Sequence, residues 1–410
     1  MKKQIILTTL ILNFVMAVSA FAQDAPVSEL TAEKISTNVV RLSGAENAVY
    51  SRTGKFLAIQ MASEFLLLPA RKPFESFAEL CSARRHSGRI IGFLSTDTLV
   101  YAAGGEIFAL DAAGQRSRKL FSQNSGQKLA DKVLSQREFV FVSDDLIIAG
   151  NGSYDMGGNP GNIYRFDLKN RRVKKGAPIK QFWEAALSPG GKYILYERGG
   201  EQSNYIDFYD VRLDKNYEAE RRFNFRKAFP RFSEWSASPL VWVGSRDAFL
   251  AYVTSGVHPD EIKPEDAEEH NKTWLCLLDA PTGRIIWKKL IKTGAFQSGF
   301  QPLNSDKVLV NYDEEVYELS LADGKERRIR GIGGKSLVIS PDKKKIAFIK
   351  SNRAFTALLN GENKKPVLDL PRGWKPATDY KGMGERPPVW SPSGDGLILF
   401  GENQLLIARL

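Results

Sequence analysis

Short apolar runs of the length of a β-strand recur along the chain, each bounded by turn-forming residues. In residues 185–197 (AALSPGGKYILYE), one apolar run ends at Ser188 and Pro189, and a second, 193–196, follows a glycine-containing turn. Apolar runs of this length that are rich in aromatic and branched residues are typical of buried strands. Serine, proline and glycine at the junction indicate a tight turn. The segment therefore predicts a β-hairpin.

Three further segments repeat this arrangement. Each has a segment that ends in a serine-containing turn, followed by a strand-like run. The turn segment 338–342 precedes the run 346–348, and 389–394 precedes 397–399. A weaker copy has the turn segment 49–55 before the run 56–59. A supersecondary unit that recurs from one end of a chain to the other indicates a ring or stack of similar units rather than independent domains.

The intervening sequence divides into units of four predicted strands, each roughly 36 to 60 residues long, which is the period of propeller blades. The units begin near residues 48, 89, 139, 183, 240, 296, 336 and 388. The last unit ends one strand short, while the run 35–42 has no partner beside it. Because an open ring exposes strand edges, we expect 35–42 to complete the last blade. The predicted fold is an all-β, eight-bladed β-propeller, with seven blades as the alternative if 80–121 is not two regular units.

The serine-containing turns resemble those of a known family. Trp390-Ser391-Pro392 and the Ser-Pro turns of the fourth and seventh units are similar to the WD40-like repeat of bacterial TolB-type propellers, in which Trp-Ser-Pro-Asp-Gly precedes a short strand. The resemblance implies the propeller fold and says little about activity. TolB proteins carry an α/β domain before the propeller. The first predicted blade of this chain begins near residue 48, so we expect no such domain here and do not transfer the role of TolB.

The first residues have the pattern of a signal peptide. Residues 1–22 combine a basic start, an apolar run and the small residues Ala20 and Ala22 at the expected cleavage site. We therefore expect 23–34 to be a flexible N-terminus, 35–410 to be a single propeller domain, and the protein to be periplasmic or secreted. The lack of a cysteine near the cleavage site argues against a lipoprotein, and no later segment is apolar enough for membrane insertion.

The chain is basic, with a formal net charge of +11. In an exported protein this excess favours anionic partners such as phospholipid, lipopolysaccharide or acidic polymers over nucleic acid. A basic surface that only maintains solubility is the simpler interpretation. The two cysteines, Cys81 and Cys276, lie about four units apart, too far for a disulfide. We expect both to be unpaired, with Cys276 in the core.

Long connections fall on one predicted rim of the ring. They are the links between the second and third strands of a blade or between successive blades, at 122–138, 151–162, 224–239, 255–272 and 371–387. Insertions on one face of a repeat protein usually mark its binding face. Drift of unconstrained loops, which tolerate length changes at little cost, is the alternative.

Two of these connections combine arginine with aromatic residues, the usual anchors of protein interfaces. The candidate interaction residues are Arg226, Arg231, Phe232 and Trp235 in 224–239, and Arg372, Trp374 and Tyr380 in 371–387. The alternative is that the aromatic residues fill gaps between blades. In 255–272, His258 and His270 lie among carboxylates and are weak metal candidates, since their spacing matches no known site and a solvated acidic loop has the same composition.

No catalytic or cofactor motif is complete. Residues 333–336 (GGKS) have the end of a P-loop without its first glycine, and the chain holds only three histidines for acid–base chemistry near neutral pH. The predicted function is an exported, non-catalytic propeller without cofactor that binds a protein or an anionic envelope component. A lyase or hydrolase acting on a carbohydrate or peptide at the channel mouth is the alternative.

Replacing Arg226, Arg231 and Trp235 together by alanine is expected to abolish capture of a partner, because it removes the charged and aromatic anchors of one predicted loop. A pull-down from envelope extract measures this. Capture at the wild-type level would exclude these residues as the binding determinants.

Overall fold

The repeated strand pattern folds into eight separate antiparallel sheets in the computed structural model of the chain. The structure describes residues 30–36, 38–71, 83–121, 139–151, 162–176, 182–188, 191–198, 205–217, 234–237, 241–243, 247–256, 272–291, 300–312, 315–377 and 386–410. Every secondary-structure element among these residues is a β-strand. The described part of the chain holds no helix long and apolar enough to cross a membrane. The signal-peptide prediction for 1–22 lies outside the described residues.

The first four blades follow one another along the chain, each a meander of four strands. Blade one contains β3 (Asn47–Tyr50), β4 (Phe56–Gln60), β5 (Glu64–Pro69) and β6 (Arg85–Ser87). Blade two contains β7 (Arg89–Phe93), β8 (Thr98–Ala103), β9 (Glu106–Asp111) and β10 (Arg116–Phe121). Blade three contains β11 (Phe139–Val142), β12 (Leu146–Asn151), β13 (Asn162–Asp167) and β14 (Arg172–Lys175). Blade four contains β15 (Phe182–Leu187), β16 (Tyr193–Arg198), β17 (Tyr205–Asp210) and β18 (Lys215–Tyr217).

The remaining blades complete the ring. Blade five contains β19 (Glu234–Ala237) and β20 (Val241–Val243), which both pair with β21 (Ala248–Gly256), then β22 (Lys272–Asp279) and β23 (Arg284–Ile291). Blade six contains β24 (Phe300–Pro302), β25 (Lys307–Tyr312), β26 (Glu315–Ser320) and β27 (Glu326–Gly333). Blade seven contains β28 (Lys335–Ile339), β29 (Lys345–Lys350), β30 (Arg353–Leu358) and β31 (Lys365–Asp369). Blade eight contains β32 (Val389–Trp390), β33 (Gly396–Gly401) and β34 (Gln404–Arg409), with β2 (Val39–Ser43) and β1 (Thr31–Ser36) beyond them.

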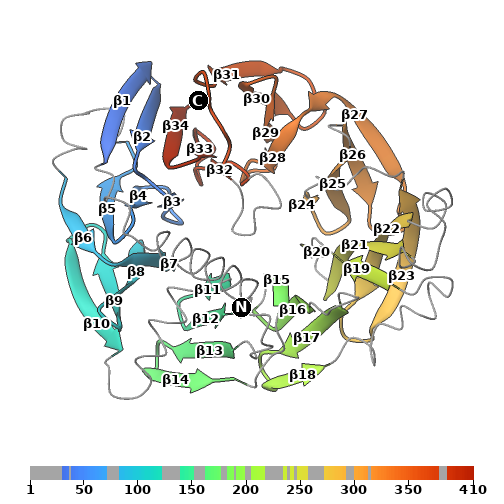
Figure 1. The fold of residues 1–410 in the computed structure, drawn as a ribbon, viewed down its shortest axis with the longest axis horizontal. Coiled ribbons are helices and arrows are strands. Elements are labelled where there is room, and N and C mark those ends of the chain that lie inside the picture. The colour runs from blue at the N-terminus through green and yellow to red at the C-terminus, as the bar shows by residue number, and fades with distance from the viewer. Residues whose placement is uncertain are drawn as a thin grey trace, which may run out of the picture.

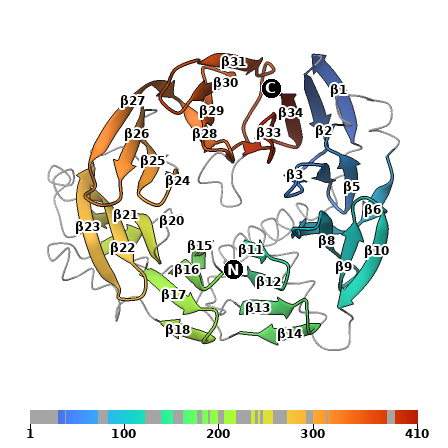
Figure 2. The same cartoon turned by 180° about the vertical axis from the view of Figure 1, so that it is seen from behind.

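The sheets stand around a common axis, with the first strand of each blade nearest the axis and the last outermost (Figures 1 and 2). This arrangement is an eight-bladed β-propeller, as the strand count predicted, and it excludes the seven-bladed alternative.

The hydrophobic core consists of separate layers between neighbouring blades. In β34, Leu405 and Ile407 pack toward blade one, whereas Leu406 and Ala408 pack toward blade seven. Successive side chains of a strand point to opposite faces, so a middle strand of a blade needs apolar residues at every position. This is why the strands appear in the sequence as continuous apolar runs rather than as strict alternation.

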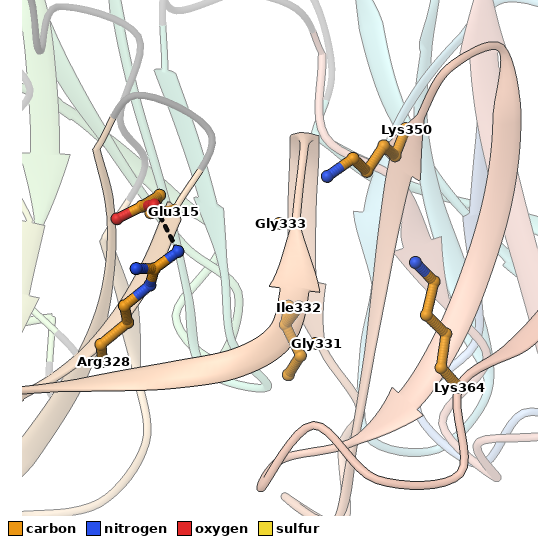
Figure 3. Close-up of a pocket in the computed structure, with 7 residues that line it drawn as sticks. All are labelled: Glu315, Arg328, Gly331, Ile332, Gly333, Lys350 and Lys364. Atoms are coloured by element: carbon orange, nitrogen blue, oxygen red, sulfur yellow. Dashed lines mark ion pairs between the residues drawn. The ribbon is translucent and has the colours of Figure 1, made fainter.

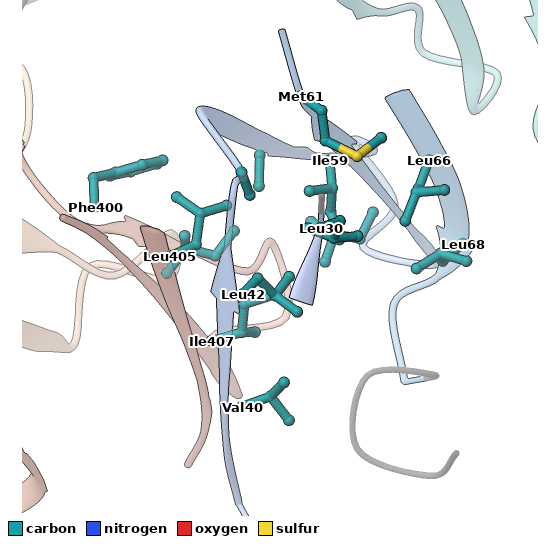
Figure 4. Close-up of a cluster of buried hydrophobic side chains, with 14 of the residues drawn as sticks. Leu30, Val40, Leu42, Ile59, Met61, Leu66, Leu68, Phe400, Leu405 and Ile407 are labelled. Carbon is teal, nitrogen blue, oxygen red and sulfur yellow. The ribbon is translucent and has the colours of Figure 1, made fainter. Parts of the chain in front are cut away.

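The ring is joined where the first described strands meet the last (Figure 1). Strand β2 pairs antiparallel with β34, from Val39 opposite Ala408 to Ser43 opposite Gln404. Leu42 is fully buried in the layer between blades eight and one, shown in Figure 4. The single strand expected at 35–42 is instead two strands, because β1 turns back onto β2 and adds a fifth strand to the sheet.

Strand β1 also shifts a predicted boundary. It begins at Thr31, inside the segment 23–34 that the sequence assigned to a flexible N-terminus. Leu30 is buried in the layer between blades eight and one, and Glu33 forms an ion pair with Arg41 of β2 at 2.9 Å. Backbone pairing and this apolar contact order residues whose own side chains are mostly polar.

Arg386 provides a second link between blades eight and one. Its guanidinium donates to the carbonyl oxygen of Glu46 at 3.1 Å and to the side-chain oxygen of Asn47 at 2.5 Å, and it lies 3.7 Å from the ring centroid of Phe400. Burial lowers the pKa of Arg386. The residue therefore connects the segment before β32 to the first blade by polar contacts as well as by packing.

The recurrent serine is the hydrogen-bonding centre of the turn between the first two strands of a blade. It is buried in all four copies, Ser51, Ser188, Ser340 and Ser391. Ser340 illustrates the geometry: its Oγ accepts a bond from the backbone N–H of Lys345 at 2.9 Å and donates to the carboxylate of Asp342 at 2.6 Å. The same bond from the N–H five residues later forms at Ser51, Ser188 and Ser391. The repeated sequence signal thus has a structural role.

Two links between blades are a single glycine, Gly88 and Gly334. Both have positive φ, and a Cβ added there would lie 2.5 Å or 2.2 Å from a backbone oxygen, respectively. A side-chain amide of the second strand fastens each link: Gln60 donates to the Gly88 carbonyl at 3.1 Å and Asn311 donates to the Gly334 carbonyl at 2.9 Å. Only glycine fits these positions.

Three outer or edge strands differ from the prediction. The apolar residues near 74–80 and at 219–223 predict the last strands of blades one and four at those positions. In the structure the last strands of these blades are β6 and β18. Both predicted segments lie outside the described residues. Strand β19 occupies part of the connection expected at 224–239, because the long strand β21 offers pairing positions beyond β20.

The two cysteines have different outcomes. Cys276 is an unpaired thiol, fully buried in β22, as predicted. Burial raises the pKa of this thiol to about 12, so it stays protonated and behaves as a small apolar core residue. Cys81 lies outside the described residues.

Replacing Leu42 by alanine is expected to lower the free energy of unfolding by about 2–5 kcal/mol, because it leaves a cavity in the layer that joins the two ends of the ring. Urea unfolding measures the change. The control is Leu213→Ala, whose side chain is 55% exposed in the turn before β18. Equal effects of the two substitutions would contradict this role for Leu42.

Replacing Ser340 by alanine is expected to cost about 1–3 kcal/mol of stability, because the N–H of Lys345 and the carboxylate of Asp342 both lose their hydrogen bond to the buried Ser340 Oγ. Thermal unfolding tests this. Ser305, which is exposed in the turn after β24, provides the matched serine-to-alanine control and should have little effect. A neutral Ser340→Ala would show that the hydroxyl is dispensable for the turn.

Candidate functional site

The outermost strands of four blades carry most of the exposed cations of their sheets. These residues, which we call the outer-strand cations, are Arg116, Arg118 and Lys119 of β10, Arg172, Lys174 and Lys175 of β14, Arg284 and Lys288 of β23, and Arg327, Arg328 and Arg330 of β27. Lysine and arginine on an edge strand oppose pairing with another sheet. These four strands lie at the outer edge of the ring (Figure 1), so their exposed cations place positive charge on the circumference at blades two, three, five and six.

Acidic residues on neighbouring strands or turns offset part of this charge. Lys119 pairs with Glu106, Lys174 with Asp214 at 2.5 Å, and Arg327 with Glu318 at 3.1 Å. All of these cations remain largely exposed, so the pairs contribute little to stability. Among the described residues no ion pair involves Arg116, Arg118 or Arg172. The outer surface of blades two and three is therefore basic.

A pocket of about 390 Å³ lies where blade six meets blade seven (Figure 3). Its lining comes from the third and fourth strands of blade six, from the end of β29 and from the turn before β31, and consists of Glu315, Arg328, Gly331, Ile332, Gly333, Lys350 and Lys364. Three cations and one carboxylate thus face one space.

Glycines set the shape of this pocket. Gly331 and Gly361 have positive φ, and a Cβ added to Gly361 would lie 1.8 Å from the carbonyl oxygen of Arg330. The outer strand of blade six therefore contacts the last turn of blade seven backbone to backbone. The run 333–336 (GGKS), which has the end of a P-loop, starts at the last residue of β27 and continues through Gly334 into β28 of the next antiparallel sheet. This is not the setting of a nucleotide-binding loop.

On one side of the pocket an arginine and a glutamate neutralise each other in an ion pair. Arg328 pairs with Glu315, and the hydroxyl of Tyr317 donates to the same carboxylate at 2.7 Å. The hydrogen bond to Glu315 raises the pKa of Tyr317, so this hydroxyl keeps its proton near neutral pH. The charge of Glu315 is therefore balanced by Arg328.

The other side carries two lysines of blade seven. Lys350 ends β29, and Lys364 precedes β31, where its Nζ lies 4.3 Å from the ring centroid of Phe355. In Figure 3 the side chains of Lys350 and Lys364 extend toward the end of β27, and the Glu315–Arg328 pair lies on the other side of that strand in this view. Residues 313–314, an aspartate and a glutamate, precede Glu315 and lie outside the described residues.

Most residues that the sequence singled out for binding lie outside the described part of the chain. They are Arg226, Arg231, Phe232, Tyr380, His258 and His270. Trp235 lies in β19, opposite Ser255 of β21, and only its backbone is described. The loop-face hypothesis for these residues stays a prediction.

Two predicted residues are placed by the structure. Arg372 is exposed in the segment after β31. Trp374 is only 8% exposed, in the core layer between blades seven and eight, and a Cβ at Gly401 would approach its ring to 2.6 Å. Its side chain fills the gap between these blades, the alternative given above for the aromatic residues.

The pocket residues Glu315, Arg328, Lys350 and Lys364 were not singled out by sequence. The Arg-Arg-x-Arg-Gly run at 327–331 was visible as charge beside glycine, but the two lysines belong to the next blade and to no motif. Their convergence depends on blade packing.

Histidine and metal chemistry are limited in the described part of the chain. His86 stacks on Phe65 with ring centroids 5.1 Å apart, and its Nε2 bonds to Gln115 at 3.1 Å. Burial lowers the pKa of His86, so its ring is neutral near pH 7 and packs as a structural residue. Within the described ranges no group of three metal-ligating side chains forms.

Comparison with known proteins identifies the fold. No protein-family profile matches the chain, and no curated protein matches it. Among solved structures, the chain is similar to the Dos1 propeller, with a TM-score of 0.52, 9% identity, and coverage of 93% of this chain and 95% of that one. An oligogalacturonate lyase in complex with manganese gives a TM-score of 0.46 at 10% identity, covering 93% and 96% of the two chains. TolB from Acinetobacter baumannii gives 0.37 at 11% identity, covering 76% and 79%. At these identities the likeness concerns the fold alone.

Proposed function

We propose that this propeller is a non-catalytic interaction module of the cell envelope, which holds an anionic surface or polymer against its basic circumference. The observation that carries the proposal is the set of exposed arginines and lysines on the outer strands, above all Arg116, Arg118 and Arg172 on the adjacent blades two and three. We also propose that residues 1–22 direct export of the protein. We further propose that the serine turns are related to the WD40-like repeat of TolB-type propellers.

The charge distribution supports this proposal. Rows of cations on neighbouring blades attract an extended anion along several contacts at once, and each basic residue near an anionic membrane contributes about 1 kcal/mol. The anchors are side chains on strands of a packed scaffold, so binding requires no rearrangement of the blades. A surface of this kind binds less tightly as salt rises, because mobile ions screen exposed charges.

The predicted loop face supplies a second part of the proposal. Arg372 is exposed in the segment after β31. It adds positive charge to the rim where the sequence predicts partner binding through the arginines and aromatic residues of 224–239. A protein partner bound at this rim is compatible with an envelope surface bound at the circumference.

Replacing Arg116, Arg118, Arg172 and Lys175 by glutamine is expected to weaken binding to vesicles of phosphatidylglycerol and phosphatidylcholine by at least about 100-fold, because four cations leave one surface. Vesicle co-sedimentation at low and high salt measures this. Vesicles of phosphatidylcholine alone should bind neither protein.

The matched control removes the same charge elsewhere. Lys34, Lys344, Lys375 and Arg409 are also exposed but lie on other elements. Their replacement by glutamine should weaken binding much less. Equal losses in the two variants would mean that net charge, rather than this surface, drives binding. Turnover of a carbohydrate or peptide substrate would instead establish the alternative, a lyase or hydrolase.

A further inference from the structure

We infer that the pocket between blades six and seven binds a phosphate group, carried either by an anionic lipid headgroup or by a soluble phosphorylated small molecule. The inference shares with the proposed function only the class of ligand, because both ligands are anions. It names a specific pocket where the proposed function needs only an extended surface.

The first argument is the charge of the lining. Arg328 is balanced by Glu315, so the net positive charge of the described lining comes from Lys350 and Lys364. Within the described residues, neither lysine forms an ion pair with a carboxylate. Two ammonium groups that face one space repel each other. A dianion between them removes this repulsion.

The lysines of the pocket differ from two other lysines close to blade six, Lys289 of β23 and Lys307 of β25. Lys289 pairs with Glu326 at 2.5 Å, and Lys307 pairs with Glu318 at 2.8 Å. Those lysines have a carboxylate partner on the same or the neighbouring blade. The aromatic ring of Phe355 beneath Lys364 holds this ammonium group in place without neutralising it. The local chemistry therefore favours an external anion.

The type of anion follows from the donors. Lysine binds phosphate as a point charge, whereas planar carboxylates are best matched by the fork of an arginine. The arginine of this pocket is already engaged by Glu315. Two lysine charges match the dianionic form of a phosphate monoester.

The size of the pocket adds a second property of the ligand. A volume of about 390 Å³ exceeds the space that a phosphate group fills and lies within the range of small-molecule sites. Ile332, which is buried, gives the lining an apolar part beside the lysines. We therefore expect a phosphate attached to a sugar-sized group.

The pocket is preformed. The contact of Gly361 with the Arg330 carbonyl and the bond from Asn311 to the Gly334 carbonyl fix blades six and seven to each other on the strand that lines it. Fixed walls reduce the ordering cost of binding.

The experiment is calorimetric titration of the full chain with inorganic phosphate and with glucose 1-phosphate, and co-sedimentation with vesicles of phosphatidic acid in phosphatidylcholine. Replacing both Lys350 and Lys364 by glutamine is expected to weaken binding of the phosphorylated probe at least tenfold. Both residues are exposed, so the variant should fold. The control is Lys343→Gln with Lys344→Gln, two exposed lysines in the serine turn of the same blade, which should bind like the wild type.

A second variant gives the opposite sign. Glu315→Gln removes the carboxylate that engages Arg328 and should tighten binding of glucose 1-phosphate, because the guanidinium becomes available to the ligand. A structural role of the ion pair would not produce this gain. Failure of every probe to bind, or wild-type binding by the lysine variant, would overturn the inference.

The results also separate this site from the proposed function. Binding of glucose 1-phosphate but not of phosphatidic acid vesicles would assign the site to a soluble ligand, and the reverse would assign it to a headgroup. The glutamine variant of the four cations on β10 and β14 should retain binding of the soluble probe. A wild-type protein that binds glucose 1-phosphate but no anionic vesicle would contradict the circumference proposal alone.

Discussion

Apolar packing between neighbouring blades is the interaction on which the rest of this structure depends. Each middle strand buries both faces, one against the preceding blade and one against the next, as Leu405 and Leu406 of β34 do on adjacent positions. A blade by itself would leave both of these faces in water. Strand β2 pairs with β34 and adds the buried Leu42 to the layer that joins the last blade to the first.

Polar groups make the same packing specific. The buried serines close the first turn of four blades, and the amides of Gln60 and Asn311 fasten single-glycine links between blades. Each of these groups satisfies backbone atoms that burial would otherwise leave unpaired, which would be costly. They fix where one blade ends and the next begins, and so determine which surface residues meet at each junction.

The outer strands are free of this constraint, and exposed charged side chains are found there. One face of an outer strand and its free edge meet water, so cations replace apolar residues on β10, β14, β23 and β27. The circumference thus forms an extended basic surface. The junction of blades six and seven adds a pocket whose lysines and ion pair come from two sheets.

The sequence by itself determined the all-β class and the serine turns, because these depend on apolar runs and on hydrogen bonds within five residues of Ser188, Ser340 and Ser391. It favoured eight blades, and the structure excluded the alternative of seven. It did not locate β6, β18 or β19, whose short polar segments carry little apolar signal. The burial of Trp374 and the meeting of Arg328 with Lys350 and Lys364 were decided only by tertiary structure. Those positions depend on which faces of separate blades pack together, and a local sequence pattern does not predict that contact.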